Sequence, residues 1–288
     1  MSTAVVHENA LTAVNRSVQV DGATLVYRRF GNAGSGAPPL LFLQHFRGNL
    51  DTWDPALVDG LAQEREVVLL DNRGVGASTG AVPDNLEDMA RDVLRFVDAL
   101  GLTAIDVLGF SLGGFVAQTL ALTRPRLIRR LVLAGTAPEG APDIHRWTDE
   151  VYALATPDSF DPDGFIRLFF SSSDEGRARG MEFLARISAR TADPDEPADL
   201  AARDAQLDAI TRWGIPDPSK LARLAAITQP TLVANGDDDP MMITENSHLL
   251  ARHLPRAQLR IYPDAGHGFL DQYPKEFADH VNAFLNGG

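Results

Sequence analysis

The stretch Gly109-Phe110-Ser111-Leu112-Gly113 decides the fold, because it joins an apolar strand candidate to a helix candidate. A G-x-S-x-G pattern at such a junction is typical of a sharp turn that exposes the serine hydroxyl. The two glycines keep the neighbouring strand and helix backbones from clashing with that turn. The pattern therefore predicts that Ser111 is a nucleophile and that the amide of Leu112, at the helix N-terminus, faces an oxyanion. The alternative is that Ser111 is only the N-cap of that helix.

Short apolar or β-branched runs alternate with helical patterns on both sides of this turn, which indicates βαβ units and a mainly parallel sheet. Asp21-Gly22 separates the first two runs and predicts an antiparallel hairpin at the start. We therefore predict an α/β fold with an eight-stranded, mostly parallel sheet and helices on both faces. The expected strands are Ser17–Val20, Thr24–Phe30, Pro39–Phe46, Arg65–Asp71, Ala104–Phe110, Leu127–Ala134, Thr231–Asn235 and Gln258–Tyr262. The expected helices include Leu86–Leu100, Ser111–Thr123, Thr244–Leu254 and Pro274–Leu285.

The pattern changes in the middle of the chain, where Ala- and Arg-rich helical stretches are broken by prolines and no strand is convincing. We predict a helical cap over residues 142–226 and a core over residues 1–141 and 227–288. Both ends of the insertion are taken to adjoin the carboxyl edges of strands, which would put the cap over the serine. An apolar substrate pocket is expected there, although most aromatic residues of a cap belong to its own core. The candidate pocket residues are Phe110, Trp147, Phe169 and Met241.

A candidate base and acid follow the last two expected strands. His267 lies between glycines in a loop after a strand, where a histidine can reach a serine. Three consecutive aspartates, residues 237–239, occupy the loop after the preceding strand. We choose Asp239, because Pro240 favours an extended conformation at the residue before it. Thr244 is expected to cap the next helix, so Asp239 is not needed for that purpose.

Five motifs in this order resemble those of the α/β-hydrolase superfamily over residues 17–286. They are Leu41-Phe42-Leu43-Gln44-His45-Phe46, Asp71-Asn72-Arg73-Gly74-Val75-Gly76-Ala77-Ser78, Gly109-Phe110-Ser111-Leu112-Gly113, Gly236-x-x-Asp239 and Gly266-His267. The resemblance implies an α/β-hydrolase fold whose triad follows the chain order Ser111, Asp239, His267.

The resemblance also implies that a second oxyanion amide comes from Phe46. Here the sequence departs from the family, because Gln44-His45 stands where His-Gly is usual. A β-carbon at residue 45 restricts the backbone beside the oxyanion hole.

The sequence is most similar to cofactor-free haloperoxidases, enol-lactonases and related carboxylesterases of that superfamily. This likeness implies a serine hydrolase that cleaves a small, largely apolar ester or lactone through an acyl-enzyme. A perhydrolase or a carbon–carbon bond hydrolase stays open, since the fold does not choose among them. A small-molecule sensor or regulatory protein is the alternative of another class. Repeated turnover would identify an enzyme, and one slow turnover with a stable adduct would identify a sensor.

The net charge of −13 would repel phosphate backbones and anionic lipid, so we expect a small-molecule substrate and neither a nucleic-acid nor a membrane partner. The absence of cysteine excludes disulfides and thiolate nucleophiles. No His or carboxylate cluster has metal-ligand spacing, so we expect no metal and no cofactor. Without a signal-peptide pattern or a membrane-length apolar run, we expect a cytoplasmic protein, and a homo-oligomer stays open.

Overall fold

The computed structural model describes residues 8–142, 144 and 147–287, and in this part of the chain eight strands form one sheet. The strand order is β1-β2-β4-β3-β5-β6-β7-β8. The pairs β1–β2 and β2–β4 are antiparallel and the other pairs are parallel, which confirms the predicted fold class. The strands are β1 Arg16–Val20, β2 Ala23–Gly31, β3 Leu40–Leu43, β4 Glu66–Leu70, β5 Ile105–Phe110, β6 Ile128–Ala134, β7 Thr231–Gly236 and β8 Ala257–Tyr262.

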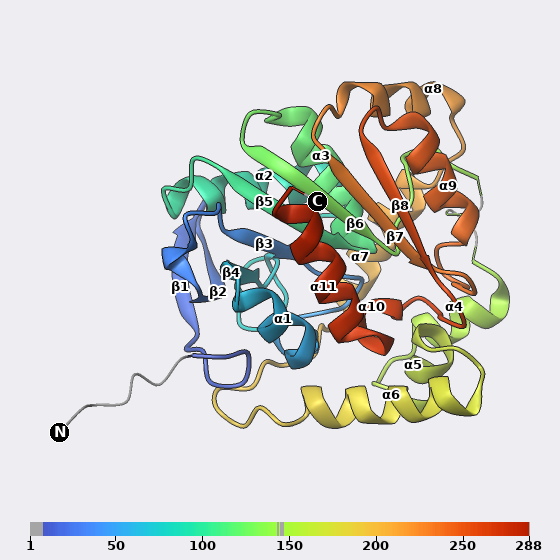
Figure 1. The fold of residues 1–288 in the computed structure, drawn as a ribbon. Coiled ribbons are helices and arrows are strands. Elements are labelled where there is room, and N and C mark those ends of the chain that lie inside the picture. The colour runs from blue at the N-terminus through green and yellow to red at the C-terminus, as the bar shows by residue number, and fades with distance from the viewer. Residues whose placement is uncertain (1–7, 143, 145–146, 288) are drawn as a thin grey trace.

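Helices cover both faces of the sheet. Figure 1 shows α1 and α11 together in front of the strands, with α2 and α3 behind them. Helix α3 is buried almost throughout, as its uniformly apolar sequence predicts, because it lies between the sheet and other helices. The helices outside the insertion are α1 Pro55–Ala62, α2 Leu86–Ala99, α3 Leu112–Thr123, α9 Thr244–His253, α10 Phe269–Gln272 and α11 Pro274–Leu285, with short 3₁₀ turns η1 Ala33–Ser35 and η2 Leu50–Thr52.

The segment between β6 and β7 is helical in its described residues. Its helices are α4 Asp149–Ala155, α5 Pro162–Phe169, α6 Asp174–Ile187, α7 Leu200–Trp213 and α8 Pro218–Leu221, followed by the 3₁₀ turn η3 Ala222–Ala226. It leaves the carboxyl end of β6 but returns to the amino end of β7, so the expectation that both of its ends adjoin carboxyl edges is wrong. The physical reason is that β6 and β7 are parallel neighbours, and their connection must cross from one edge of the sheet to the other.

The parts of this segment lie in different places. In Figure 1, α4, α5 and α6 lie beyond the carboxyl ends of the parallel strands. Helix α7 instead packs beside the core, where the Trp213 ring stacks on Phe115 of α3 with centroids 5.1 Å apart. The first helices of the insertion are therefore the ones that can cover a site at the end of β5.

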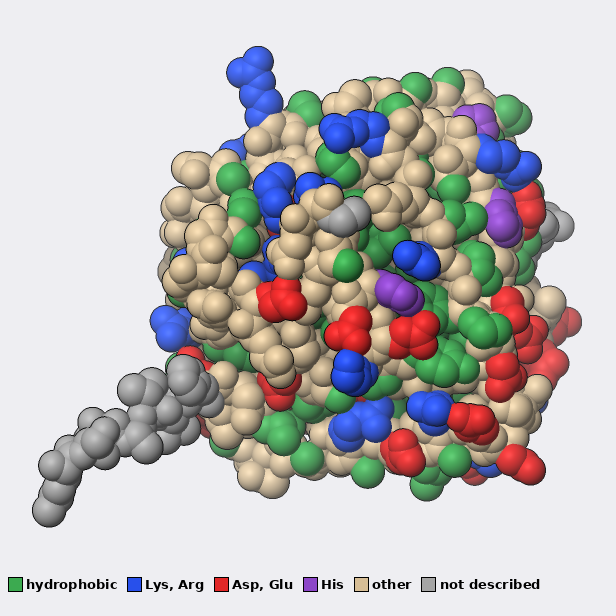
Figure 2. All heavy atoms as spheres, viewed as in Figure 1, with side chains coloured by type: hydrophobic (Ala, Val, Ile, Leu, Met, Phe, Trp, Pro, Cys, Tyr) green, Lys and Arg blue, Asp and Glu red, His purple; other side chains and the backbone are tan. Residues whose placement is uncertain are grey.

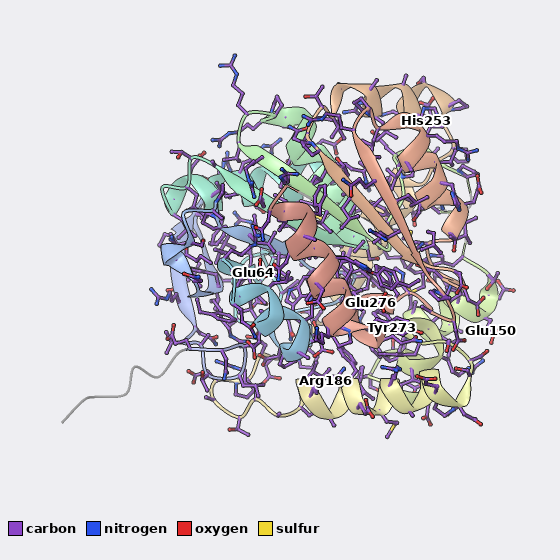
Figure 3. The ribbon with its side chains drawn as sticks, viewed as in Figure 1. Glu64, Glu150, Arg186, His253, Tyr273 and Glu276 are labelled. Carbon is purple, nitrogen blue, oxygen red and sulfur yellow. The ribbon has the colours of Figure 1, made fainter. Side chains whose placement is uncertain are left out.

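An ion pair attaches α6 to the core. Arg186, labelled in Figure 3, points from α6 toward the region of α1 and α11. Its Nη2 lies 2.6 Å from Oδ2 of Asp54, a carboxylate with a fully buried side chain that also caps α1. The same buried carboxylate thus fixes the start of α1 and the end of α6.

On the surface that Figure 2 displays, acidic and basic side chains are interspersed among apolar ones. No helix in the described part of the chain is both long enough and apolar enough to cross a membrane.

Candidate active site

Ser111 occupies a strained turn between β5 and α3. Its φ of 54° and ψ of −117° lie in a region that L-residues rarely adopt. The turn is held by the Ser111 amide, which donates to the Ala134 carbonyl at 2.9 Å, and by the Thr136 hydroxyl, which donates to the Ser111 carbonyl at 2.8 Å. A β-carbon on Gly113 would collide with the Leu43 carbonyl. The glycine is therefore required for α3 to pack against the end of β3, as the motif predicts.

His267 is paired with Asp239 in the buried interior. The Nδ1 atom of His267 lies 2.8 Å from Oδ2 of Asp239, and both side chains are at most 1% exposed. The other carboxylate oxygen, Oδ1, accepts the backbone N–H groups of Met241 and Met242, each at 2.8 Å. In the neutral imidazole, the carboxylate holds the proton on Nδ1 and leaves the Nε2 lone pair free, and this buried atom has no hydrogen-bond partner in the described residues. A proton can therefore be accepted there.

The two neighbouring aspartates are placed differently. Asp237 and Asp238 are exposed, and Oδ1 of Asp237 accepts the Ala265 amide at 3.2 Å, which ties the acid loop to the histidine loop. Thr244 does not cap α9, contrary to the expectation. The N-cap residue is Ile243, without a side-chain cap, and the Thr244 hydroxyl donates to the Gly236 carbonyl at 2.7 Å. The threonine closes the turn after β7 instead.

Phe46 lies in a loop, because β3 ends at Leu43 and does not extend to residue 46 as predicted. The strand ends there because Oε1 of the Gln44 side chain accepts the His45 amide at 2.8 Å and turns the chain away from the sheet. The amides of Phe46 and Leu112 have no acceptor among the described residues. Both predicted oxyanion donors are thus unpaired.

Ser111 and His267 line one cavity of about 380 Å³. No hydrogen bond joins the Ser111 hydroxyl to Nε2 of His267 in this structure, and such contacts commonly tighten only when substrate binds. The apolar wall of this cavity includes Phe165, Phe169 and Met241. Two of the four predicted pocket residues, Phe169 and Met241, therefore line the cavity.

The other two, Phe110 and Trp147, do not line it. Phe110 is 1% exposed and supports the ring of His267 from behind, with centroids 5.1 Å apart. Trp147 is held outside the cavity because its Nε1 donates to the Met241 carbonyl at 3.1 Å while its ring packs edge-on against Phe46.

Several lining residues were missed by the sequence argument. Some, such as Leu154 and Ile187, are apolar and carry no local signal that separates them from the core of the insertion. Others form a polar end of the cavity, which no sequence signal marks because it joins segments distant in the chain. The missed residues include His45, Arg47, Asn49, Asp51, Thr52, Leu154, Ile187 and Asp195. In the described residues no group of three or more His, Asp or Glu side chains could hold a metal ion.

Comparison with known proteins places the chain in a family. The α/β hydrolase fold family matches residues 38–274, so the chain belongs to that family and is a hydrolase. A solved α/β hydrolase fold protein from Chitinophaga pinensis is 39% identical, with a TM-score of 0.92, over 98% of this chain and 100% of that one. A poly(3-hydroxyalkanoate) depolymerase from Ectopseudomonas oleovorans is 31% identical over 86% of this chain and 84% of its own length.

A crystal structure of the enol-lactonase from Burkholderia xenovorans LB400 is also similar. It is 22% identical over 94% of this chain and 100% of that one, with a TM-score of 0.77. At this identity the likeness concerns the fold alone.

Proposed function

We propose that this protein is a serine hydrolase that cleaves a small, largely apolar carboxylic ester or lactone through an acyl-enzyme. Ser111 is the nucleophile, His267 the base, and Asp239 the carboxylate that orients the base. One observation carries the proposal: the serine on its strained turn and the carboxylate-bound histidine line the same cavity.

The acylation half of the reaction follows from this arrangement. Nε2 of His267 takes the proton of the Ser111 hydroxyl as its oxygen attacks the substrate carbonyl. The carbonyl electron pair moves onto oxygen, and the amides of Leu112 and Phe46 stabilise the resulting oxyanion. When the carbon–oxygen bond breaks, His267 returns the proton to the leaving alkoxide. The resulting alcohol departs from an ester, or stays attached to the acyl group when the substrate is a lactone.

Deacylation repeats the same proton transfers with water. His267 takes a proton from water, the hydroxide attacks the acyl-enzyme carbonyl, and the serine oxygen leaves with the proton that the histidine returns. Asp239 stabilises the imidazolium in both halves, because its Oδ2 contacts Nδ1 while Oδ1 is anchored by two backbone amides. The carboxylate therefore does not have to reorganise during the reaction.

The wall of the cavity supports an apolar substrate. Phe165 stacks on Phe169 at 3.9 Å between ring centroids, and Met241 faces the same space, so the wall favours hydrocarbon. The name of one relative points the same way, since the poly(3-hydroxyalkanoate) depolymerase that is 31% identical is named for a polyester.

A substrate panel tests the proposal. Wild type and Ser111→Ala would be assayed against p-nitrophenyl esters of increasing acyl length, lactones and anilides. We expect repeated turnover of esters or lactones that Ser111→Ala abolishes, and an organophosphonate probe should label Ser111 alone, as peptide mass spectrometry would report. Label on another residue, or turnover that survives in Ser111→Ala, would contradict the assignment. A single slow turnover with a stable adduct would identify a sensor.

A further inference from the structure

The loop after β3 leaves one backbone amide unpaired in a run of four. The His45 amide donates to Oε1 of Gln44 at 2.8 Å, and the Arg47 amide donates to Oε1 of Gln206 on α7 at 2.7 Å. The Gly48 amide donates to the His45 carbonyl at 3.1 Å. Only the Phe46 amide is left without an acceptor among the described residues. Phe46 is buried and lines the cavity that also contains Ser111, so its unpaired amide is available to a ligand atom there.

The ring of His45 provides the next contact in this loop. Its Nδ1 lies 2.8 Å from the Phe46 carbonyl oxygen, and because a carbonyl only accepts, Nδ1 carries the proton. Burial lowers the pKa of His45 to about 3, a change that the bond to Phe46 opposes and the nearby His267 reinforces. The imidazole therefore stays neutral, and it packs edge-on against the rings of Phe110 and Phe169, each 5.2 Å away.

These contacts anchor the backbone on both sides of the unpaired amide. The peptide before it is held through the Gln44 side chain, which itself donates to the Asn49 carbonyl and to the Thr52 hydroxyl. The carbonyl after it is held by the His45 ring. Arg47, with φ of 65°, takes a conformation that would relax if these anchors were lost. The direction of the Phe46 N–H thus depends on His45 and Gln44 together.

We infer that His45 is a positioning residue that aims the Phe46 amide at the developing oxyanion through its Nδ1–H bond to the Phe46 carbonyl. The inference rests on the proposed function, since it assigns to His45 the support of one oxyanion donor. It also accounts for Gln44-His45 in place of the family's His-Gly: two side chains hold the loop where glycine would leave it free.

Two substitutions distinguish the role of Nδ1 of His45 from that of Nε2. In His45→Asn the amide Nδ2 occupies the place of Nδ1 and can still donate to the Phe46 carbonyl. In His45→Gln the amide sits near the place of Nε2, and that donor is lost. His45→Leu removes both polar positions. Because loss of an oxyanion donor lowers kcat by about 10²- to 10³-fold, we expect a 10- to 100-fold loss of kcat in His45→Gln and His45→Leu, with KM little changed and His45→Asn close to wild type.

A second measurement distinguishes positioning from a general loss of structure. A trifluoromethyl ketone forms an oxyanion on Ser111, whereas an ether analogue of the substrate does not. Affinity for the ketone should fall in parallel with kcat across the three variants, while affinity for the ether stays near that of wild type. Phe277→Leu, a core change remote from the loop, serves as the control and should affect both ligands equally.

The outcomes are distinct. If the wild type shows no Ser111 adduct and no ester turnover, the proposed function fails. If the wild type is active and His45→Leu keeps its kcat and its ketone affinity, only the role of His45 is overturned. If His45→Gln is active and His45→Asn is not, His45 acts through Nε2 and the inference is equally overturned.

Discussion

Asp239→Asn is the sharpest test of the acid, because the contacts of Asp239 determine how the asparagine must lie. Oδ1 of Asp239 accepts the amides of Met241 and Met242, and Oδ2 accepts from His267. An asparagine has one oxygen and one NH₂ group. If its oxygen stays on the two backbone amides, the NH₂ group faces Nδ1 of His267. In the reverse orientation the NH₂ group would face the N–H groups of two backbone amides, donor against donor. The orientation with the oxygen on the backbone amides is therefore favoured.

The consequence is a change of tautomer. With an NH₂ donor opposite, Nδ1 must accept, so the imidazole proton moves to Nε2 and the ring loses the lone pair that receives the serine proton. We expect kcat to fall by about 10³- to 10⁴-fold, equivalent to ~4 to 5.5 kcal/mol in the barrier. The fold should persist, because both backbone amides keep their acceptor.

Steady-state hydrolysis of a p-nitrophenyl ester would measure the loss, and thermal unfolding would check the fold. Asp238→Asn is a matched control, with the same charge change at an exposed neighbour, and should lose less than about tenfold. Asp237→Asn should behave similarly, since its carboxylate contacts the Ala265 amide and not the histidine. Near-wild-type activity in Asp239→Asn, together with collapse in either control, would refute the reasoning.

Two further substitutions test other parts of the structure. Gly113→Ala puts a β-carbon against the Leu43 carbonyl. The substitution should lower the free energy of unfolding by about 1 to 3 kcal/mol, as thermal unfolding would measure, and should also lower ester turnover. An unchanged free energy of unfolding would contradict the close approach. Burial, and then the charge of Asp51, raise the pKa of Asp195 from 3.8 to about 6, so the folded protein holds a proton that the unfolded chain releases between about pH 4 and pH 6. The stability that this group contributes is thus lost as pH rises through that window, and Asp195→Asn should raise Tm at about pH 8 more than at about pH 4.5, as calorimetry would show.

The sheet and the loops that carry the candidate triad could be predicted because their signals are local. Apolar runs mark each strand. The glycines around Ser111 are required because neighbouring backbone leaves no room for a β-carbon: Gly109 lies against the Gly113 carbonyl, and Gly113 lies against Leu43. Asp239 could be chosen from its two neighbours because Pro240 restricts the backbone beside it. In each case the deciding residues lie within a few positions of the feature.

The rest depends on contacts that no short window contains. The end of β3 is decided by the Gln44 side chain, and Trp147 is drawn away from the cavity by the Met241 carbonyl, which lies far along the chain. The polar end of the cavity joins the loop before α7 to the loop after β3, where the Asp195 amide donates to Oδ2 of Asp51 at 2.8 Å. Such pairings follow from the packed fold and not from periodicity or turn chemistry.

Two buried carboxylates show why burial alone does not identify a functional group. Asp239 and Asp195 both lie near the cavity with side chains at most 1% exposed. Asp239 accepts three hydrogen bonds, two from backbone amides, which hold it fixed beside His267. Asp195 accepts no hydrogen bond from an N–H group in the described residues: its contacts are with the carboxyl group of Asp71 and with Nη2 of Arg28, its ion-pair partner, 3.9 Å away. A carboxylate can steer a histidine only if its own oxygens are held, so the count of donors, more than depth, separates Asp239 from its neighbours.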